Sequence, residues 1–121
     1  MADQRPGASP PPDGGEPEQE DDPGHRFAYY LRMLLDENPG NRWKAADSLG
    51  RLGDPRATGP LIDALFDEDA RVRVKVAWAL GSIGDIRALA PLRQLYRIEN
   101  QDQQEIIEEA IANITQQKSG Q

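Results

Sequence analysis

The feature that most constrains this sequence is a segment of about 25 residues that occurs twice, 31 residues apart. The copies are residues 42–66 and 73–97, and eleven of the 25 aligned positions hold the same amino acid. The identities include two phrases, Leu-Gly-x-x-Gly-Asp and Arg-Ala-x-x-Pro-Leu. A fixed period of this length is typical of repeat proteins, in which each unit buries its apolar face against the next unit. The chain is therefore expected to fold as a stack of similar units.

Within each copy the apolar residues recur at helical spacing, and glycine or proline separates one run from the next. The predicted fold class is therefore all-α. About six helices are predicted, over residues 26–36, 41–52, 55–66, 67–83, 86–97 and 102–117. The predicted apolar stripes of these helices consist of Phe27, Tyr30, Leu31, Leu34, Leu35, Ala45, Ala46, Leu49, Leu52, Leu61, Ile62, Leu65, Val72, Val76, Ala77, Leu80, Ile83, Leu89, Leu92, Leu95, Ile107, Ile111 and Ile114.

The same period divides the predicted repeat domain, residues 25–117, into four parts. Residues 26–38 align with the second half of a repeat, and residues 41–69 and 70–100 are full repeats. Residues 101–117 align with the first helix of a repeat but have lost its arginine, its glycines and its Gly-Asp turn. Their many Glu and Gln side chains are expected of a capping helix that faces water.

Two pairs of glycines recur at different places in the pattern. Gly50 and Gly81 fall in the last turn of a predicted helix, where glycine costs about 1 kcal/mol relative to alanine. Their recurrence predicts that another helix comes too close there for a Cβ atom. Gly53 and Gly84 follow the helix end, and they suit the C′ position, which needs positive φ.

The residues after each Gly-Asp turn predict how the next helix starts. Asp54 and Asp85 suit the N-cap, and Pro55 suits the first helical position. Pro60 and Pro91 fall further inside the same segments, where a proline removes a backbone hydrogen bond and clashes with the preceding turn. A break is therefore expected, with the regular helix beginning near each proline.

Residues 1–24 differ from the rest of the chain in composition. They hold six of the ten prolines, seven acids and one base, and they contain no Leu, Ile, Val or aromatic residue. Such a segment cannot bury enough apolar area to offset the entropy of ordering it. We therefore expect a disordered acidic tail, with an interaction tail for a basic partner as the functional alternative. Residues 118–121 are expected to fray.

Composition excludes several classes of function. The chain has no cysteine, which excludes disulfides, thiol catalysis and cysteine-based metal sites. No apolar run is long enough to span a membrane and the N-terminus has no signal-peptide pattern, so a cytoplasmic protein is expected. After residue 24, 14 acids nearly balance 13 bases, so no basic excess favours nucleic acid as a partner.

No catalytic, cofactor or metal site is predicted from the residue types. Ser48, Thr58 and Ser82 have no histidine in the repeat region to activate them as nucleophiles. Residues 67–69 are three acids without the spacing of a calcium loop, and they are interpreted as the start of a helix. Residues 49–54 lack the lysine of a phosphate-binding loop, and they are interpreted as a helix C-cap.

Residues 67–92 contain the phrase DEDxxVRxxxAxALGxIGDxRAxxPL. It resembles the short HEAT-like repeats of the phycobilisome-lyase type, and the resemblance extends over about residues 27–114. The resemblance implies an α-solenoid of antiparallel helix pairs. It implies no single function, because that family includes scaffolds, bilin lyases and deoxyhypusine hydroxylase.

In such solenoids the helix that carries the Val-Arg…Ala-Leu-Gly phrase usually lines the concave face. The resemblance therefore implies that the outward positions of these helices bind a partner. Those positions are Trp43, Lys44, Asp47, Arg51, Val74, Lys75, Trp78, Ser82, Glu105, Ile106, Glu109 and Asn113. Because tryptophan is enriched at interface hot spots, Trp43 and Trp78 are the predicted anchors. The alternative is that each tryptophan packs flat on a neighbouring helix as semi-buried core.

Arg42 and Arg73 recur near the start of these two helices. One interpretation is an anion site. The favoured interpretation is that each guanidinium holds a loop carboxylate or carbonyl between repeats, since its rigid fork suits that role.

Three functional hypotheses remain open. The favoured one is a non-enzymatic scaffold that binds another protein or peptide on the concave face. The second is a bilin lyase or hydroxylase-related subunit without an identifiable active site; its di-iron relatives use repeated His-Glu pairs, whereas this chain has only His25. The third is self-association through an apolar stack end around Phe27, Tyr29 and Tyr30, because three repeats are near the minimum for a stable stack.

Overall fold

The computed structural model describes residues 23–119, and every regular element in that range is a helix. The predicted all-α class with six α-helices is therefore confirmed. The elements are α1 (Pro23–Met33), α2 (Pro39–Leu52), η1 (Pro55–Ala57), α3 (Thr58–Ala64), α4 (Ala70–Ile83), η2 (Ile86–Ala88), α5 (Leu89–Ile98) and α6 (Gln101–Ser119). Here η denotes a single 3₁₀ turn. The prediction of a disordered tail concerns residues that lie almost entirely outside the described part of the chain.

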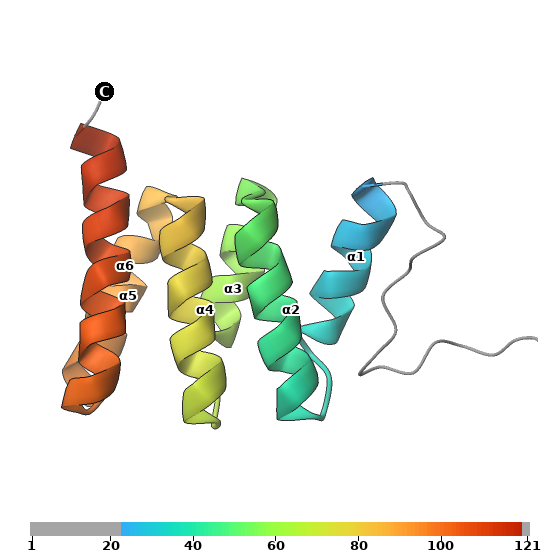
Figure 1. Ribbon diagram of the computed structural model, residues 1–121, viewed down its shortest axis with the longest axis horizontal. Helices are drawn as coiled ribbons and strands as arrows, with labels where there is room; N and C mark the ends of the chain where they lie inside the picture. Colours follow the sequence, from blue (N-terminus) through green and yellow to red (C-terminus); the bar gives the residue numbers. More distant parts are fainter. Residues whose placement is uncertain (1–22, 120–121) are drawn as a thin grey trace, which may run out of the picture.

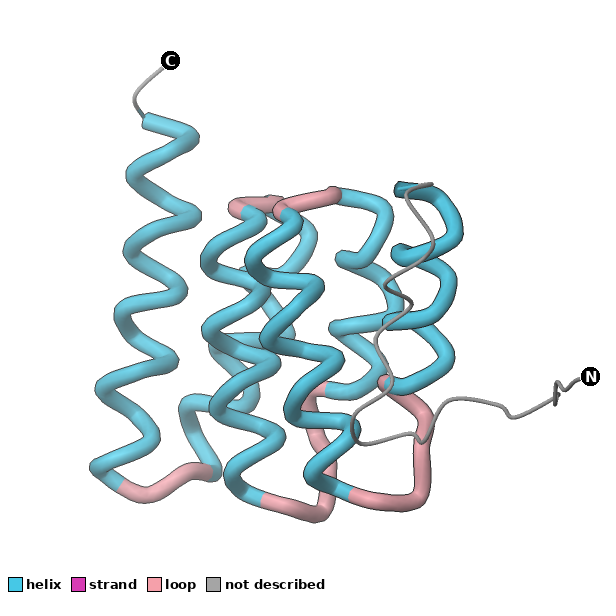
Figure 2. The backbone as a smooth tube through the Cα atoms, turned by 45° about the vertical axis from the view of Figure 1, so that its right-hand side comes forward, coloured by secondary structure: helices cyan, strands magenta, loops and turns pink. Residues whose placement is uncertain are grey.

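The helices form two layers (Figure 1). Helices α2, α4 and α6 lie side by side in one layer, with α3 and α5 behind them. In sequence order α1 packs on α2, α3 on α4 and α5 on α6, while α4 contacts both α2 and α6. Figure 2 shows the connecting loops gathered at the two ends of the helices. The result is a stack of helix pairs, as the sequence period predicts. None of the described helices is both long enough and apolar enough to cross a membrane.

The core follows the predicted apolar stripes and lies between the two layers. Its largest fully buried side chains are Leu49, Leu61, Leu65, Leu80, Leu92, Leu95, Ile107, Ile114, Val72 and Val76. Two predicted positions are wrong. Leu52 is 44% exposed, because no helix of its layer precedes α2 in the described residues and nothing covers that side. Leu35 is 82% exposed, because α1 ends at Met33 and Leu35 lies in the turn beyond it.

The predicted close approach at the two helical glycines is confirmed. A Cβ atom on Gly50 would lie 2.9 Å from the Cα atom of Ala79, and one on Gly81 would lie 2.8 Å from the Cα atom of Ala110. Real side chains do not come so close to a backbone atom, so only glycine fits without displacing the neighbouring helix. The spacing of α2, α4 and α6 therefore depends on these two positions.

The predicted turns are confirmed, with a small shift at the break. Gly53 and Gly84 cap their helices at φ 69° and 80°, and the N–H groups donate to Leu49 O and Leu80 O. Asp54 and Asp85 then accept hydrogen bonds from the backbone N–H groups two residues later. A 3₁₀ turn follows, and the α-helix begins two residues before Pro60 or Pro91. Each proline therefore lies in the first turn, where its missing N–H would have no acceptor.

Of the three aromatic residues expected at an apolar stack end, Phe27 and Tyr30 are buried and Tyr29 is half-buried. Phe27 is 8% and Tyr30 is 7% exposed, because both pack into the core of their own chain. The guanidinium of Arg56 covers the ring of Phe27 at 4.4 Å from its centroid. The ring of Phe27 is therefore covered at this end of the stack, whereas the neighbouring side of α2 at Leu52 is open.

Candidate functional site

The outward positions predicted from the sequence all belong to α2, α4 and α6, and we call the surface that they are predicted to form the α2–α4–α6 face. The exposed members are Trp43, Lys44, Arg51, Ser82, Glu105, Ile106, Glu109 and Asn113. The half-buried members are Asp47, Val74, Lys75 and Trp78. The two tryptophans therefore differ. Trp43 is 38% exposed, whereas Trp78 packs against the core and its ring would contact a Cβ atom on Gly50.

An aromatic and charged cluster connects α2 to α4 on this face. The Nζ atom of Lys75 lies 4.6 Å from the ring centroid of Trp43 and 4.4 Å from that of Trp78. It also lies 3.1 Å from Asp47 Oδ1, while Arg51 Nε donates to the other oxygen of Asp47 at 2.8 Å. A cation between two indole faces is attracted by both ring quadrupoles. The lysine therefore holds both indoles in place across the boundary between repeats.

Trp43 also borders two shallow hollows. One has a volume of about 420 Å³ and lies near Pro39, Lys44 and Val72; the other has about 270 Å³ and lies toward α6. Trp43 and Arg71 line both hollows. The full set of lining residues is Pro39, Gly40, Trp43, Lys44, Arg71 and Val72 for the first, and Trp43, Arg71, Val74, Asp102, Gln103 and Ile106 for the second. Trp43, Val74 and Ile106 thus form an apolar band that crosses all three helices.

Charge is divided across the same face. Its bases lie on α2 and α4, where Asp47 and Asp69 pair with three of them, and its remaining acids lie on α6. No Lys or Arg occurs in α6 between residues 101 and 117. The bases are Lys44, Arg51, Arg71 and Lys75, and the α6 acids are Asp102, Glu105 and Glu109. A ligand across this face would therefore meet positive charge at one end and negative charge at the other.

The N-cap of α4 holds one of these bases. Asp69 accepts from the N–H of Arg71 at 2.8 Å, and Arg71 Nη2 lies 3.0 Å from Asp69 Oδ2. The hydrogen bond from the Arg71 side chain lowers the pKa of Asp69 to about 2, and the backbone N–H contributes further. The carboxylate stays ionised at neutral pH, so it positions the guanidinium beside both hollows.

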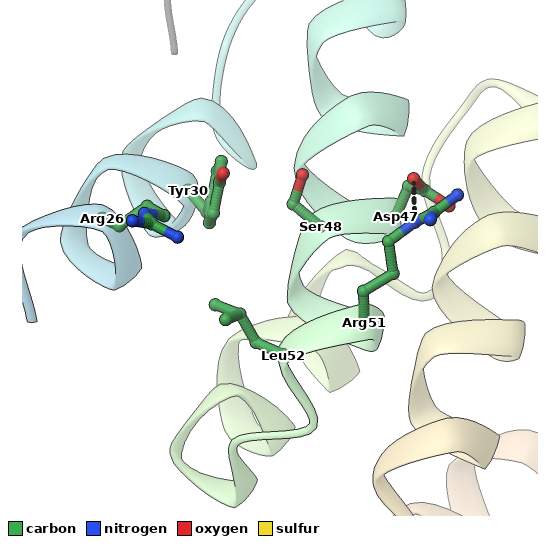
Figure 3. Close-up of a pocket in the computed structure, with 6 residues that line it drawn as sticks. All are labelled: Arg26, Tyr30, Asp47, Ser48, Arg51 and Leu52. Carbon is green, nitrogen blue, oxygen red and sulfur yellow. Dashed lines mark hydrogen bonds and ion pairs between the residues drawn. The ribbon is translucent and has the colours of Figure 1, made fainter. Parts of the chain in front are cut away.

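A third hollow, of about 400 Å³, was missed by the sequence analysis (Figure 3). Tyr30 of α1 faces Ser48 and Leu52 of α2 across it, and Arg26 lies beside Tyr30. It exists because α2 begins its layer, so the side of α2 that a preceding helix would cover is open. The sequence indicates this hollow only through Leu52, an apolar residue in the stripe of a helix that has no preceding neighbour in its layer.

Arg42 and Arg73 join adjacent loops, as the favoured interpretation predicts. Arg42 donates to both oxygens of Asp67 at 2.7 and 2.9 Å, and also to the carbonyls of Asp36 and Glu37. Arg73 repeats this arrangement with the Glu99 carboxylate and the carbonyl of Asp67. Both guanidinium groups are largely buried and occupied, so neither is an anion site.

The pKa of Asp67 reflects this arrangement. Burial raises the pKa of its carboxyl, but hydrogen bonds from the Arg42 side chain and the Asp69 N–H outweigh that effect, and the pKa lies below its ordinary value. The buried pair therefore stays charged at neutral pH.

Among residues 23–119, no group of three or more His, Cys, Asp or Glu side chains is placed to hold a metal ion. The hydroxyl-bearing residues named above are also dispersed: Thr58 is buried, Ser48 lines the hollow of Figure 3 and Ser82 is exposed on α4. The structure brings Trp43, Trp78, Asp47 and Lys75 together across α2 and α4.

Comparison with known proteins finds a match to one family model. Residues 29–112 match a family model described as HEAT repeats. No curated protein matches the chain.

Proposed function

Since the chain belongs to the HEAT-repeat family, whose members generally act as protein-interaction scaffolds, we propose that it binds a partner protein or peptide on the α2–α4–α6 face. The proposed role is non-enzymatic, as is typical of the family. The proposed contact residues are Trp43, Lys44, Asp47, Arg51, Val74, Lys75, Trp78, Ser82, Ile106 and Glu109.

The observation that carries the proposal is the position of Trp43. Trp43 is 38% exposed and borders two hollows, and the ammonium group of Lys75 lies 4.6 Å from the centroid of its ring. An exposed aromatic side chain held in one orientation loses little conformational entropy on binding, which is the property of interface anchors. Val74 and Ile106 extend its apolar surface toward α6. Trp78, by contrast, contributes by supporting Lys75 from below the surface.

A finer assignment, to HEAT-like repeats of the phycobilisome-lyase type, is part of the same proposal. It is supported by the 31-residue period and by the recurring turn phrase with its confirmed glycine and aspartate caps. This subtype describes the repeat unit and brings no activity with it.

The test is the affinity of a recovered partner for matched variants. Tagged wild type is used to capture partners from the native lysate, and a recovered protein is then titrated by calorimetry against the wild type and against Trp43→Ala. Truncation of an anchor is expected to weaken binding by roughly tenfold or more. Gln94→Ala, at an exposed position of α5 in the other layer, is the control and should bind like the wild type. Equal affinity of Trp43→Ala, at an unchanged melting temperature, contradicts the proposal.

A further inference from the structure

A second apolar surface lies away from the α2–α4–α6 face. Leu35 is 82% exposed and Phe66 is 47% exposed, and both line one hollow of about 500 Å³. Leu35 follows the end of α1 and Phe66 follows the end of α3, so the hollow lies where these helices enter their loops. Those loops are at the lower end of the stack in Figure 1.

The fold does not require apolar side chains at these two positions. Leu35 and Phe66 are 31 residues apart, and each lies two residues beyond the end of its helix; one further period along the sequence is Arg97, which is exposed within α5. The core contacts at this level come from the preceding residues, Leu34 at 2% and Leu65 at 0% exposure. Core packing therefore leaves the exposed leucine and phenylalanine unexplained, and exposed apolar residues gathered in one place often mark a binding site.

The hollow is surrounded by negative charge. Five carboxylates and one guanidinium line it. The guanidinium belongs to Arg42, which already bonds to Asp67 and to two loop carbonyls. Glu37, Asp63 and Glu68 are exposed, and the side chain of Glu68 is 89% accessible. The apolar centre is therefore bordered by acids that face solvent.

We infer that the Leu35–Phe66 hollow binds a basic amphipathic segment of a partner protein. Apolar side chains of that segment would cover Leu35 and Phe66, and flanking Lys or Arg side chains would face Glu37, Asp63 and Glu68. Charge complementarity selects this occupant. A second copy of the chain in an isologous contact would bring the same acids against one another, which is unfavourable. This inference is independent of the function proposed for the α2–α4–α6 face.

The probe is a synthetic helical peptide of about four turns, with Leu on one face and Lys on the other. Two matched peptides replace Lys by Glu or Leu by Ser. Binding to the full chain is measured by fluorescence anisotropy, and the site is mapped by amide shifts in ¹⁵N spectra. We expect the Leu/Lys peptide to bind roughly tenfold or more tightly than either matched peptide, less tightly as salt rises, and with shifts centred on residues 34–37 and 63–68.

The decisive variant is Leu35→Lys with Phe66→Lys, which should keep the fold because both side chains are exposed and the neighbouring Leu34 and Leu65 supply the core contacts. It is expected to lose at least about tenfold in affinity for the Leu/Lys peptide. Ile98→Lys, at another apolar position that is 69% exposed, and Trp43→Ala, on the α2–α4–α6 face, should bind like the wild type.

Three outcomes would overturn the inference. They are absence of binding, equal binding by the double lysine variant, and equal binding of the Leu/Glu peptide. Sedimentation provides a fourth test. If the wild type dimerises and the double lysine variant is a monomer, a second copy occupies the hollow and the inferred occupant is wrong.

Discussion

The α2–α4 junction brings Gly50 against Ala79, and the α4–α6 junction brings Gly81 against Ala110. In both cases the missing Cβ lets two backbones approach to a distance that no other residue permits. The interior of the two junctions is therefore set by the same steric requirement, and the two copies of the repeat satisfy it with the same residue at the same place.

The outer surfaces of the two junctions differ. Over the first, Lys75 lies between the indoles of Trp43 and Trp78. Over the second, Val74 and Ile106 line one hollow together with Asp102 of α6. This difference indicates that the repeat fixes the distance between neighbouring helices, whereas the side chains on the outer surface of each junction can vary. Recognition by this chain is therefore best sought where its repeats differ.

The largest expected loss of stability follows from a substitution at the buried glycine of the α4–α6 junction. Gly81→Ala places a Cβ 2.8 Å from both Cα and Cβ of Ala110, so α6 must shift. We expect a net loss of about 3 kcal/mol in the free energy of unfolding, after the gain of about 1 kcal/mol in helix propensity. Urea denaturation measures the change.

Gly59→Ala is the matched control for that substitution. No atom lies within 4 Å of a Cβ at Gly59, so this variant should be as stable as the wild type or slightly more stable. A Gly81→Ala protein with wild-type stability would mean that α4 and α6 are not held at this distance.

The second effect concerns the loops that join the repeats. Arg42→Ala leaves the buried Asp67 carboxylate without its partner and the carbonyls of Asp36 and Glu37 without a donor. The expected loss in the free energy of unfolding is about 3 kcal/mol. Arg42→Lys should recover only part of it, because an ammonium group cannot bind both carboxylate oxygens and the carbonyls together. Full recovery by lysine would argue against a geometric role.

The third prediction compares how much Trp43 and Trp78 each contribute to the free energy of unfolding. Trp78→Ala removes a side chain that packs on the core, and the expected loss in the free energy of unfolding is about 2 kcal/mol. Trp43→Ala removes a more exposed ring, and the expected loss is about 1 kcal/mol or less. Denaturant melts of the two variants test the difference. Equal losses would mean that both tryptophans are core residues and would weaken the assignment of Trp43 as an anchor.

The sequence predicted well those features that depend on one turn or on one pair of residues and that occur in both copies of the repeat. Positive φ at Gly53 and Gly84 needs only the turn, and the Asp54 and Asp85 caps need only the backbone two residues later. The role of Arg42 was also predictable, because its equivalent position also carries an arginine beside an acidic loop.

The features that were missed depend on which neighbours exist. Leu52 carries the residue type of a core position, but its exposure follows from α2 being first in its layer. Lys75 lies between two rings because side chains from α2 and α4 point toward one another. The sequence alone does not predict these side-chain directions. For the same reason the hollow between Leu35 and Phe66 was not predicted, since it needs the ends of α1 and α3 side by side.

The smallest expected change in stability concerns the two turns in which Asp54 and Asp85 cap equivalent 3₁₀ segments. The side-chain hydrogen bond from Arg87 holds the pKa of Asp85 at about 2, below its ordinary value of 3.8. As the pH falls, the unfolded chain binds this proton before the folded chain does. The stabilisation is therefore complete above about pH 4 and is lost as the pH falls toward 2. Asp85→Ala should cost about 1 kcal/mol at pH 7, as for a lost N-cap, and Asp54→Ala less, since its carboxylate is more exposed. In urea melts at each pH, the gap between Asp85→Ala and the wild type should close below pH 4; a gap of constant size would show that the carboxylate charge is not what stabilises the turn.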